Sequence, residues 1–240
     1  MQDLSKIITT NVVNFTSGKP HEVVFDVDNH TYHVDGVETP SPTKILGLLG
    51  KDLLGWAAKV AVDKYIETGN YGAAVHAYIN IRDEAGVVGT IIHKYAEDFP
   101  EVTEYPETIN GYNGNLIKNG IDAFVKFYNE NDIEFLHDEL VVYSETGFVG
   151  TLDGIVILNG KKTLLDWKTS KRFYIEQSYQ VSSYVFAYEE QTGDLIEQIV
   201  IVRLDKYTGK YHLKYVDLEK ARATYMNIFK NLLNIHYEKA

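Results

Sequence analysis

The spacing of apolar residues predicts a chain that alternates between helices and strands. A period of three to four residues marks a helix, as at 115–131, where Ile121, Phe124, Val125 and Tyr128 fall on one face. The same reasoning predicts helices at 41–49 after Ser41 and Pro42, at about 53–98 with breaks near Gly69 and Gly86–Gly89, at 175–191, and at 217–237 with Asp217 as its cap.

Strict alternation of apolar and polar residues predicts the strands. Near the N-terminus, Glu22–Gly36 alternates and turns at Asp28-Asn29, which is typical of a hairpin. Further strands are expected at Phe135–Tyr143, Phe148–Leu158, Thr163–Lys168, Ile196–Leu204 and Tyr211–Val216.

The order of these elements is typical of an α/β fold with a mixed central β-sheet flanked by helices. A length of 240 residues suits one domain. We therefore expect a single domain over 1–240, with an N-terminal hairpin in 1–40, a helical extension in 41–132 and an α/β core in 133–240.

The two strands that flank Asn159-Gly160 carry the most informative polar residues. Asn-Gly favours a two-residue turn, because both central positions of a type I′ turn need positive φ. In the resulting register, Asp153 lies directly opposite Asp166, and Lys168 shares their face with Ile155 and Leu164. Leu152, Val156, Leu165 and Trp167 are expected on the other face.

Two carboxylates on strands with two apolar faces need compensation, because buried like charges repel. They must share a proton, pair with a cation such as Lys168, or bind a metal. A buried Asp–Lys ion pair without chemistry explains one aspartate, whereas the second, in register, favours a metal site. Oxygen ligands without cysteine favour Mg²⁺ or Mn²⁺.

Composition narrows the partners and the setting. The chain has no cysteine, which excludes disulfides, thiolate zinc sites and cysteine-ligated iron–sulfur clusters, and it favours a cytoplasmic location. No apolar run approaches the roughly 20 residues of a membrane span. The net charge of −11 argues against coating nucleic acid by bulk attraction. A nucleic-acid site would therefore need a local basic patch or bridging cations.

An ordered set of motifs resembles the PD-(D/E)XK nuclease superfamily, within its RecB-like branch of phage-type exonucleases. Gly150-Thr-Leu-Asp153 is followed by the hairpin and by Asp166-Trp-Lys168, and Gly89-Thr-Ile-Ile-His93 precedes them. Gln180-Val-Ser-Ser-Tyr184 follows on the next predicted helix. The likeness covers most of the chain and implies a restriction-endonuclease-like core.

The resemblance also implies roles for individual residues. His93, Asp153, Asp166 and the carbonyl of Trp167 would ligate Mg²⁺ or Mn²⁺, and Lys168 would assist the attacking water. The catalytic set would then be Asp153, Asp166 and Lys168. Gln180 and Tyr184, one helical turn apart, would support the lysine or contact the DNA backbone. Lys171 and Arg172 follow Lys168 closely and could meet phosphates.

Several of these assignments have alternatives. Gly72-Ala-Ala-Val-His76 has the same form as the motif of His93, although His93 is favoured because Glu97 follows one turn later. Gln180, Tyr184 and Tyr188 could equally form a packing stripe on one helix face. Glu139 is interpreted as a solvated strand end in preference to a supporting acid.

The expected function is therefore a metal-dependent deoxyribonuclease, an exonuclease on linear or single-stranded DNA ends in phage-type replication, recombination or repair. The helices before Asp98 would form a wall that admits a strand end. The alternatives are a catalytically silent DNA-binding or assembly subunit, and an endonuclease of restriction or junction-resolving type. The resemblance leaves open a homo-oligomer or a partner recombination or replication protein.

Overall fold

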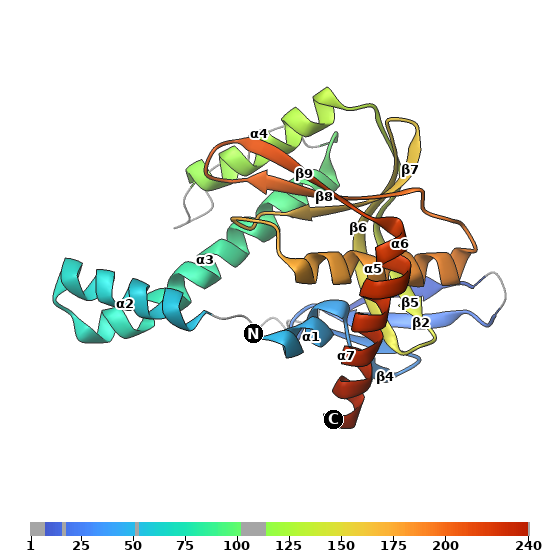
Figure 1. The fold of residues 1–240 in the computed structure, drawn as a ribbon, viewed down its shortest axis with the longest axis horizontal. Coiled ribbons are helices and arrows are strands. Elements are labelled where there is room, and N and C mark those ends of the chain that lie inside the picture. Colours follow the sequence, from blue (N-terminus) through green and yellow to red (C-terminus); the bar gives the residue numbers. More distant parts are fainter. Residues whose placement is uncertain (1–7, 16–17, 51–52, 102–113, 240) are drawn as a thin grey trace, which may run out of the picture.

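The computed structural model describes residues 8–15, 18–50, 53–101 and 114–239 and shows a mixed α/β fold (Figure 1). Its centre is a five-stranded sheet in which β7 and β8 are parallel and the other neighbours antiparallel. The predicted mixed sheet is thus confirmed. Its strands, in spatial order, are β5 (Ile133–Ser144), β6 (Phe148–Leu158), β7 (Lys161–Lys168), β8 (Gln198–Asp205) and β9 (Lys210–Val216).

Helices cover both faces of this sheet, which explains why its central strands are apolar on both sides. On one face, Ile155 and Leu164 pack with residues of α5 (Ile175–Thr192) and α7 (Met226–Lys239). On the other, Val156, Leu165 and Trp167 pack with residues of α3 (Tyr71–Asp98) and α4 (Gly114–Glu130). Between β9 and α7 lie α6 (Leu218–Lys220) and a π-helical turn, Ala221–Tyr225.

The N-terminal hairpin belongs to a larger unit than the sequence predicts. β2 (His21–Asp26) and β3 (Thr31–Val34) form the expected hairpin, but β1 (Ile8–Val13) and β4 (Val37–Thr39) extend it to a four-stranded antiparallel sheet. The hydroxyl groups of Tyr32 and Thr151 lie 2.9 Å apart and join this sheet to β6. α1 (Pro42–Leu46), capped by the Ser41 hydroxyl, and a 3-10 turn, Gly47–Leu49, follow.

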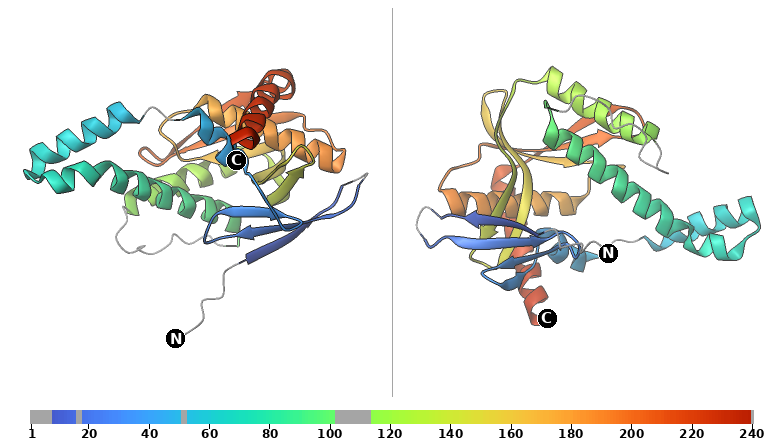
Figure 2. Two further views of the ribbon diagram at one scale, coloured as in Figure 1. Left: turned by 90° about the horizontal axis from the view of Figure 1, so that it is seen from below. Right: turned by 180° about the vertical axis from the view of Figure 1, so that it is seen from behind.

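The long helical region breaks once rather than twice. Gly69, in the left-handed conformation at φ 64°, ends α2 (Leu54–Thr68), as expected. The break predicted at Gly86–Gly89 is wrong, because α3 runs through both glycines from Tyr71 to Asp98. α2 and the first part of α3 project from the body as a helical hairpin (Figures 1 and 2). No helix within the described ranges is both long and apolar enough to cross a membrane.

Candidate active site

The hairpin that carries the candidate acids forms in the predicted register. Asn159 and Gly160 have φ of 50° and 80°, as a type I′ turn requires, and Leu158 pairs with Lys161. The pairs continue to Gly154 opposite Leu165. This part of the prediction is therefore confirmed.

The ladder ends one pair before the acids. The expected pairs Asp153–Asp166 and Thr151–Lys168 are not part of it, and β5 also pairs on either side of Asp153 without including it. Instead, Oδ2 of Asp153 accepts the backbone N–H of Trp167 at 2.6 Å. The side chain of Asp153 thus takes a donor that a backbone carbonyl would have taken in a continuous ladder.

This irregularity moves side chains between faces of the sheet. Leu152, predicted to lie with Val156, packs instead in the cluster of Ile155 and Leu164. Strict alternation cannot place Leu152 and Ile155 on one face, so the strand changes face at Asp153 and Gly154. In the facing strand, Glu139 adopts a φ of 45°, which is uncommon for a residue with a side chain.

Asp166 and Lys168 form a buried ion pair. Nζ of Lys168 lies 2.8 and 2.7 Å from the two oxygens of Asp166, whose residue is 2% exposed. Oδ2 of Asp166 nevertheless lacks a well-aligned hydrogen bond. Burial raises the pKa of Asp166 to about 6, with Asp153 adding to the rise and Lys168 opposing it. For Lys168, the attraction of both aspartates outweighs burial and raises its pKa.

His93 completes the cluster. Its Nδ1 lies 3.7 Å from Oδ1 of Asp153. Burial opposes the charged imidazole, but Asp153 outweighs it and raises the pKa of His93. Burial likewise disfavours ionised Asp153, yet His93, Lys168 and the Trp167 N–H together lower its pKa. His76 is exposed on the outer half of α3, so the structure brings His93, and not His76, to the acids.

The glycines of the motifs mark close approaches at this cluster. A Cβ on Gly89, one turn before His93, would lie 3.0 Å from the Thr169 hydroxyl. A Cβ on Gly150 would lie 3.0 Å from both the ring of Tyr184 and Pro42. Small residues at these two positions therefore let α3 and α5 approach the strands that carry Asp153 and Lys168.

Tyr184 fits the interpretation as a packing residue, whereas Gln180 fits the interpretation as a site residue. Tyr184 is 5% exposed and packs in the hydrophobic core, so the packing interpretation describes its ring. Gln180 Nε2 donates to the Tyr184 hydroxyl at 3.2 Å and to the Thr43 hydroxyl at 3.3 Å. Tyr184 thus orients Gln180, and Gln180, unlike Tyr184, lines a cavity beside Lys168.

The other predicted residues lie around the cluster. The indole ring of Trp167 packs edge-on against Phe124 and Phe127, which leaves its backbone beside Asp153. Lys171 and Arg172 are exposed, with their cations over the rings of Tyr207 and Tyr174. They lie in the loop that follows Lys168, as the sequence predicted.

A second group of acids adjoins the cluster and was underrated from the sequence. Glu97, Asp138 and Glu139 are among the residues that line a surface hollow. Partial burial and the charges of Asp153 and Glu97 raise the pKa of Glu139 to about 7. Glu139 is exposed, as expected for a solvated residue, but it lies within β5 and not at a strand end, and its carboxylate is close enough to Asp153 and His93 to be affected by their charges. Alternation along the strand does not predict the orientation of Glu139, because the bulge in β5 near His137 shifts the pairing of the residues that follow.

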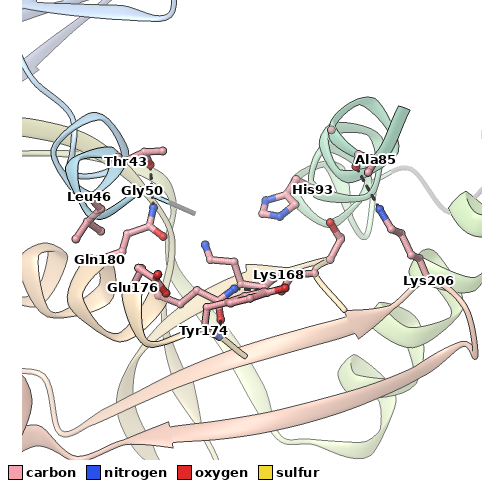
Figure 3. Close-up of a pocket in the computed structure, with 15 residues that line it drawn as sticks. Thr43, Leu46, Gly50, Ala85, His93, Lys168, Tyr174, Glu176, Gln180 and Lys206 are labelled. Atoms are coloured by element: carbon pink, nitrogen blue, oxygen red, sulfur yellow. Dashed lines mark hydrogen bonds between the residues drawn. The ribbon is translucent and has the colours of Figure 1, made fainter. Parts of the chain in front are cut away.

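A cavity of about 590 Å³ opens beside Lys168 and His93. Thr43 and Gln180 lie on one side and Ala85 and Lys206 on the other, with Lys168 between them (Figure 3). A solvent-accessible space therefore adjoins Lys168 and His93, the two partners of the acids, and a substrate group could reach these side chains from it.

The carboxylates of Asp153 and Asp166 and the imidazole of His93 are chemically suitable ligands for a divalent cation. Carboxylate and imidazole groups adjoin, and Oδ2 of Asp166, although close to the Lys168 ammonium, lacks a well-aligned hydrogen bond. Among the residues that the structure describes, however, no three His, Cys, Asp or Glu side chains converge as a ready metal cluster. An ion would have to compete with Lys168 for Asp166 and with His93 for Asp153.

Comparison with known proteins does not assign the chain to a family or a function. No protein-family model matches the chain, and no curated protein matches it significantly. We therefore infer the function from the site itself.

Proposed function

We propose that the chain is a metal-dependent deoxyribonuclease that hydrolyses phosphodiester bonds, acting as an exonuclease on linear or single-stranded DNA ends. One observation carries the proposal. Asp153, Asp166, Lys168 and His93 lie together, although they come from β6, β7 and α3, and two of them, His93 and Lys168, line a cavity. Perturbed carboxylates and a buried lysine in a cleft are typical of catalytic sites.

His93, Asp153 and Asp166, with the backbone carbonyl of Trp167, would hold the ion. When bound, Mg²⁺ or Mn²⁺ would lower the pKa of a coordinated water and stabilise charge on the phosphate. Its positive charge would also offset the acidity of the chain for an anionic substrate.

Lys168 acts in this proposal as a donor and not as a base. Its raised pKa keeps the ammonium charged at neutral pH. The side chain of Lys168 is 19% exposed and lines the cavity, so its ammonium can hydrogen-bond an incoming water or a phosphate oxygen there. Gln180, held by Tyr184 and Thr43, offers an amide to the same cavity.

The test is cleavage of labelled linear and closed circular DNA with Mg²⁺ or Mn²⁺, by wild type, Asp166→Asn and Lys168→Met. We expect wild type to degrade linear DNA from its ends and both variants to lose at least 100-fold in rate. Lys161→Met, at the exposed far end of the same hairpin, is the matched control. Intact linear DNA with both metals would contradict the proposal, and cutting of closed circles would indicate an endonuclease.

A second candidate is a catalytically silent DNA-binding subunit. The close Asp166–Lys168 pair, together with the lack of a ready three-ligand cluster in the described part of the chain, favours it. Tight DNA binding by wild type without cleavage in either metal would support this alternative.

A further inference from the structure

Lys206 is a buried cation for which the proposed chemistry has no use. It lies in the turn between β8 and β9 and is 5% exposed. Its Nζ donates to the carbonyl oxygen of Ala85 on α3 at 3.2 Å. An ammonium has three donors and is costly to bury with a neutral partner alone.

The charges near Lys206 do not compensate it well. Glu84 attracts the ammonium and Lys171 repels it, while burial has the largest effect and lowers the pKa of Lys206. A neighbouring positive charge and burial both favour the approach of an anion to such an ammonium. The turn itself is anchored, since Asn119 donates to the backbone carbonyl of Lys206 at 3.2 Å.

Lys206 faces the cavity that contains Lys168 and His93 (Figure 3). Beside it, Gly86 of α3 leaves open space where a side chain would begin. The cavity thus has room for a ligand group next to a buried, incompletely paired ammonium. We propose that Lys206 binds a phosphate of the substrate strand next to the one that is hydrolysed, an inference that rests on the proposed nuclease function.

The first test is Lys206→Met, which keeps the length of the stem and removes the charge. A lost phosphate contact should raise KM for a labelled oligothymidylate about 10-fold, with kcat within about twofold. It should also reduce the slope of log binding constant against log salt, measured with Ca²⁺, by about 0.7. Lys206→Arg should restore most of the affinity.

Lys214→Met is the matched control. Lys214 is also partly buried with a neutral partner, the Ser178 hydroxyl at 2.8 Å, but it does not line the cavity. We expect its KM and salt slope to match wild type. A purely structural Lys206 would instead lower the melting temperature in Lys206→Met and leave the salt slope unchanged.

A second pair of variants tests the site without altering Lys206. Gly86→Glu and Gly86→Gln place side chains of equal size in the open space, and only the first repels a phosphate. We expect Gly86→Glu to bind DNA at least 10-fold more weakly than Gly86→Gln. Equal binding by this pair, or an unchanged salt slope in folded Lys206→Met while wild type cleaves DNA, overturns this inference alone. A wild type that neither binds nor cleaves DNA overturns it together with the proposed function.

Discussion

The carboxylate of Asp153 accepts the backbone N–H of Trp167 at 2.6 Å, at the place where the ladder between β6 and β7 ends. A side chain thus replaces a main-chain acceptor, and the strand changes face at the same point. The exchange leaves Asp153 near Asp166 without the direct pairing that an uninterrupted hairpin would impose. The site therefore lies where the regular pairing between β6 and β7 is interrupted.

Removal of the lysine from the buried pair should destabilise the protein in a pH-dependent way. In Lys168→Met, Asp166 loses its cation, so its pKa should rise above the value of about 6 that it has with Lys168. We expect a loss of about 2–4 kcal/mol in unfolding free energy at pH 8, where the acid must ionise without a partner. At pH 5 the carboxyl is already protonated, and the loss should be less than half of that.

Denaturant titrations at the two pH values measure this difference. Asp166→Asn/Lys168→Met is the control, because it removes both charges and should recover most of the stability at pH 8. Equal losses at pH 5 and pH 8 in the single variant would show that Lys168 acts through packing and not through its charge.

Gly150 should resist even the smallest side chain. An added Cβ would lie 3.0 Å from the Tyr184 ring and from Pro42, so Gly150→Ala must displace one of them. We expect a loss of about 1–3 kcal/mol in stability and a reduced rate, since Tyr184 orients Gln180. Gly154→Ala, on the same strand, has no contact closer than 3.6 Å and should cost less. Thermal melts of the two variants measure the difference, and a melting temperature of Gly150→Ala as high as that of Gly154→Ala would contradict the prediction.

Glu139 should destabilise the folded protein as it ionises. Its pKa is about 7 in the folded state and 4.5 ordinarily, so the folded state holds more protons between these values. Stability should therefore fall as the pH rises from 4.5 to 7. Asp166, with a pKa of about 6, contributes a decline of the same sign, so Glu139→Gln should reduce the decline without abolishing it. The variant should be more stable than wild type by about 1 kcal/mol at pH 8, after allowance for solvent screening, and about equal at pH 4.5.

The exposed Glu134, on the same strand, supplies the control for this measurement. Glu134→Gln should leave the pH dependence of wild type unchanged. A decline as large in Glu139→Gln as in wild type would assign the titration to other acids of the cluster.

Local signals predicted much of the fold. The turn at Asn159-Gly160 set the register of β6 and β7, because its positive φ values permit few alternatives. Periodicity located α4, whose apolar face is well defined. The break predicted at Gly86–Gly89 failed because glycine weakens a helix without ending it when tertiary packing, here against Thr169, favours close approach.

Other features have no signal in one sequence. β1 and β4 are strands because they pair with β2 and β3, and the short run Val37–Thr39 shows no clear alternation of its own. The position of Glu139 follows from a bulge, and that of Lys206 from the packing of a turn against α3. The sequence predicted the acids, the histidine and Lys168 but not these neighbours, which depend on tertiary contacts.

The most direct test of the proposed metal site is the position of a bound ion. A crystal grown with Mn²⁺ and measured for anomalous scattering would show whether an ion lies between the carboxylates of Asp153 and Asp166. We expect one Mn²⁺ peak with both carboxylates and His93 among its ligands, and its loss in Asp166→Asn. A structure at saturating Mn²⁺ in which Lys168 still occupies Asp166 and no peak lies at these residues would contradict this prediction.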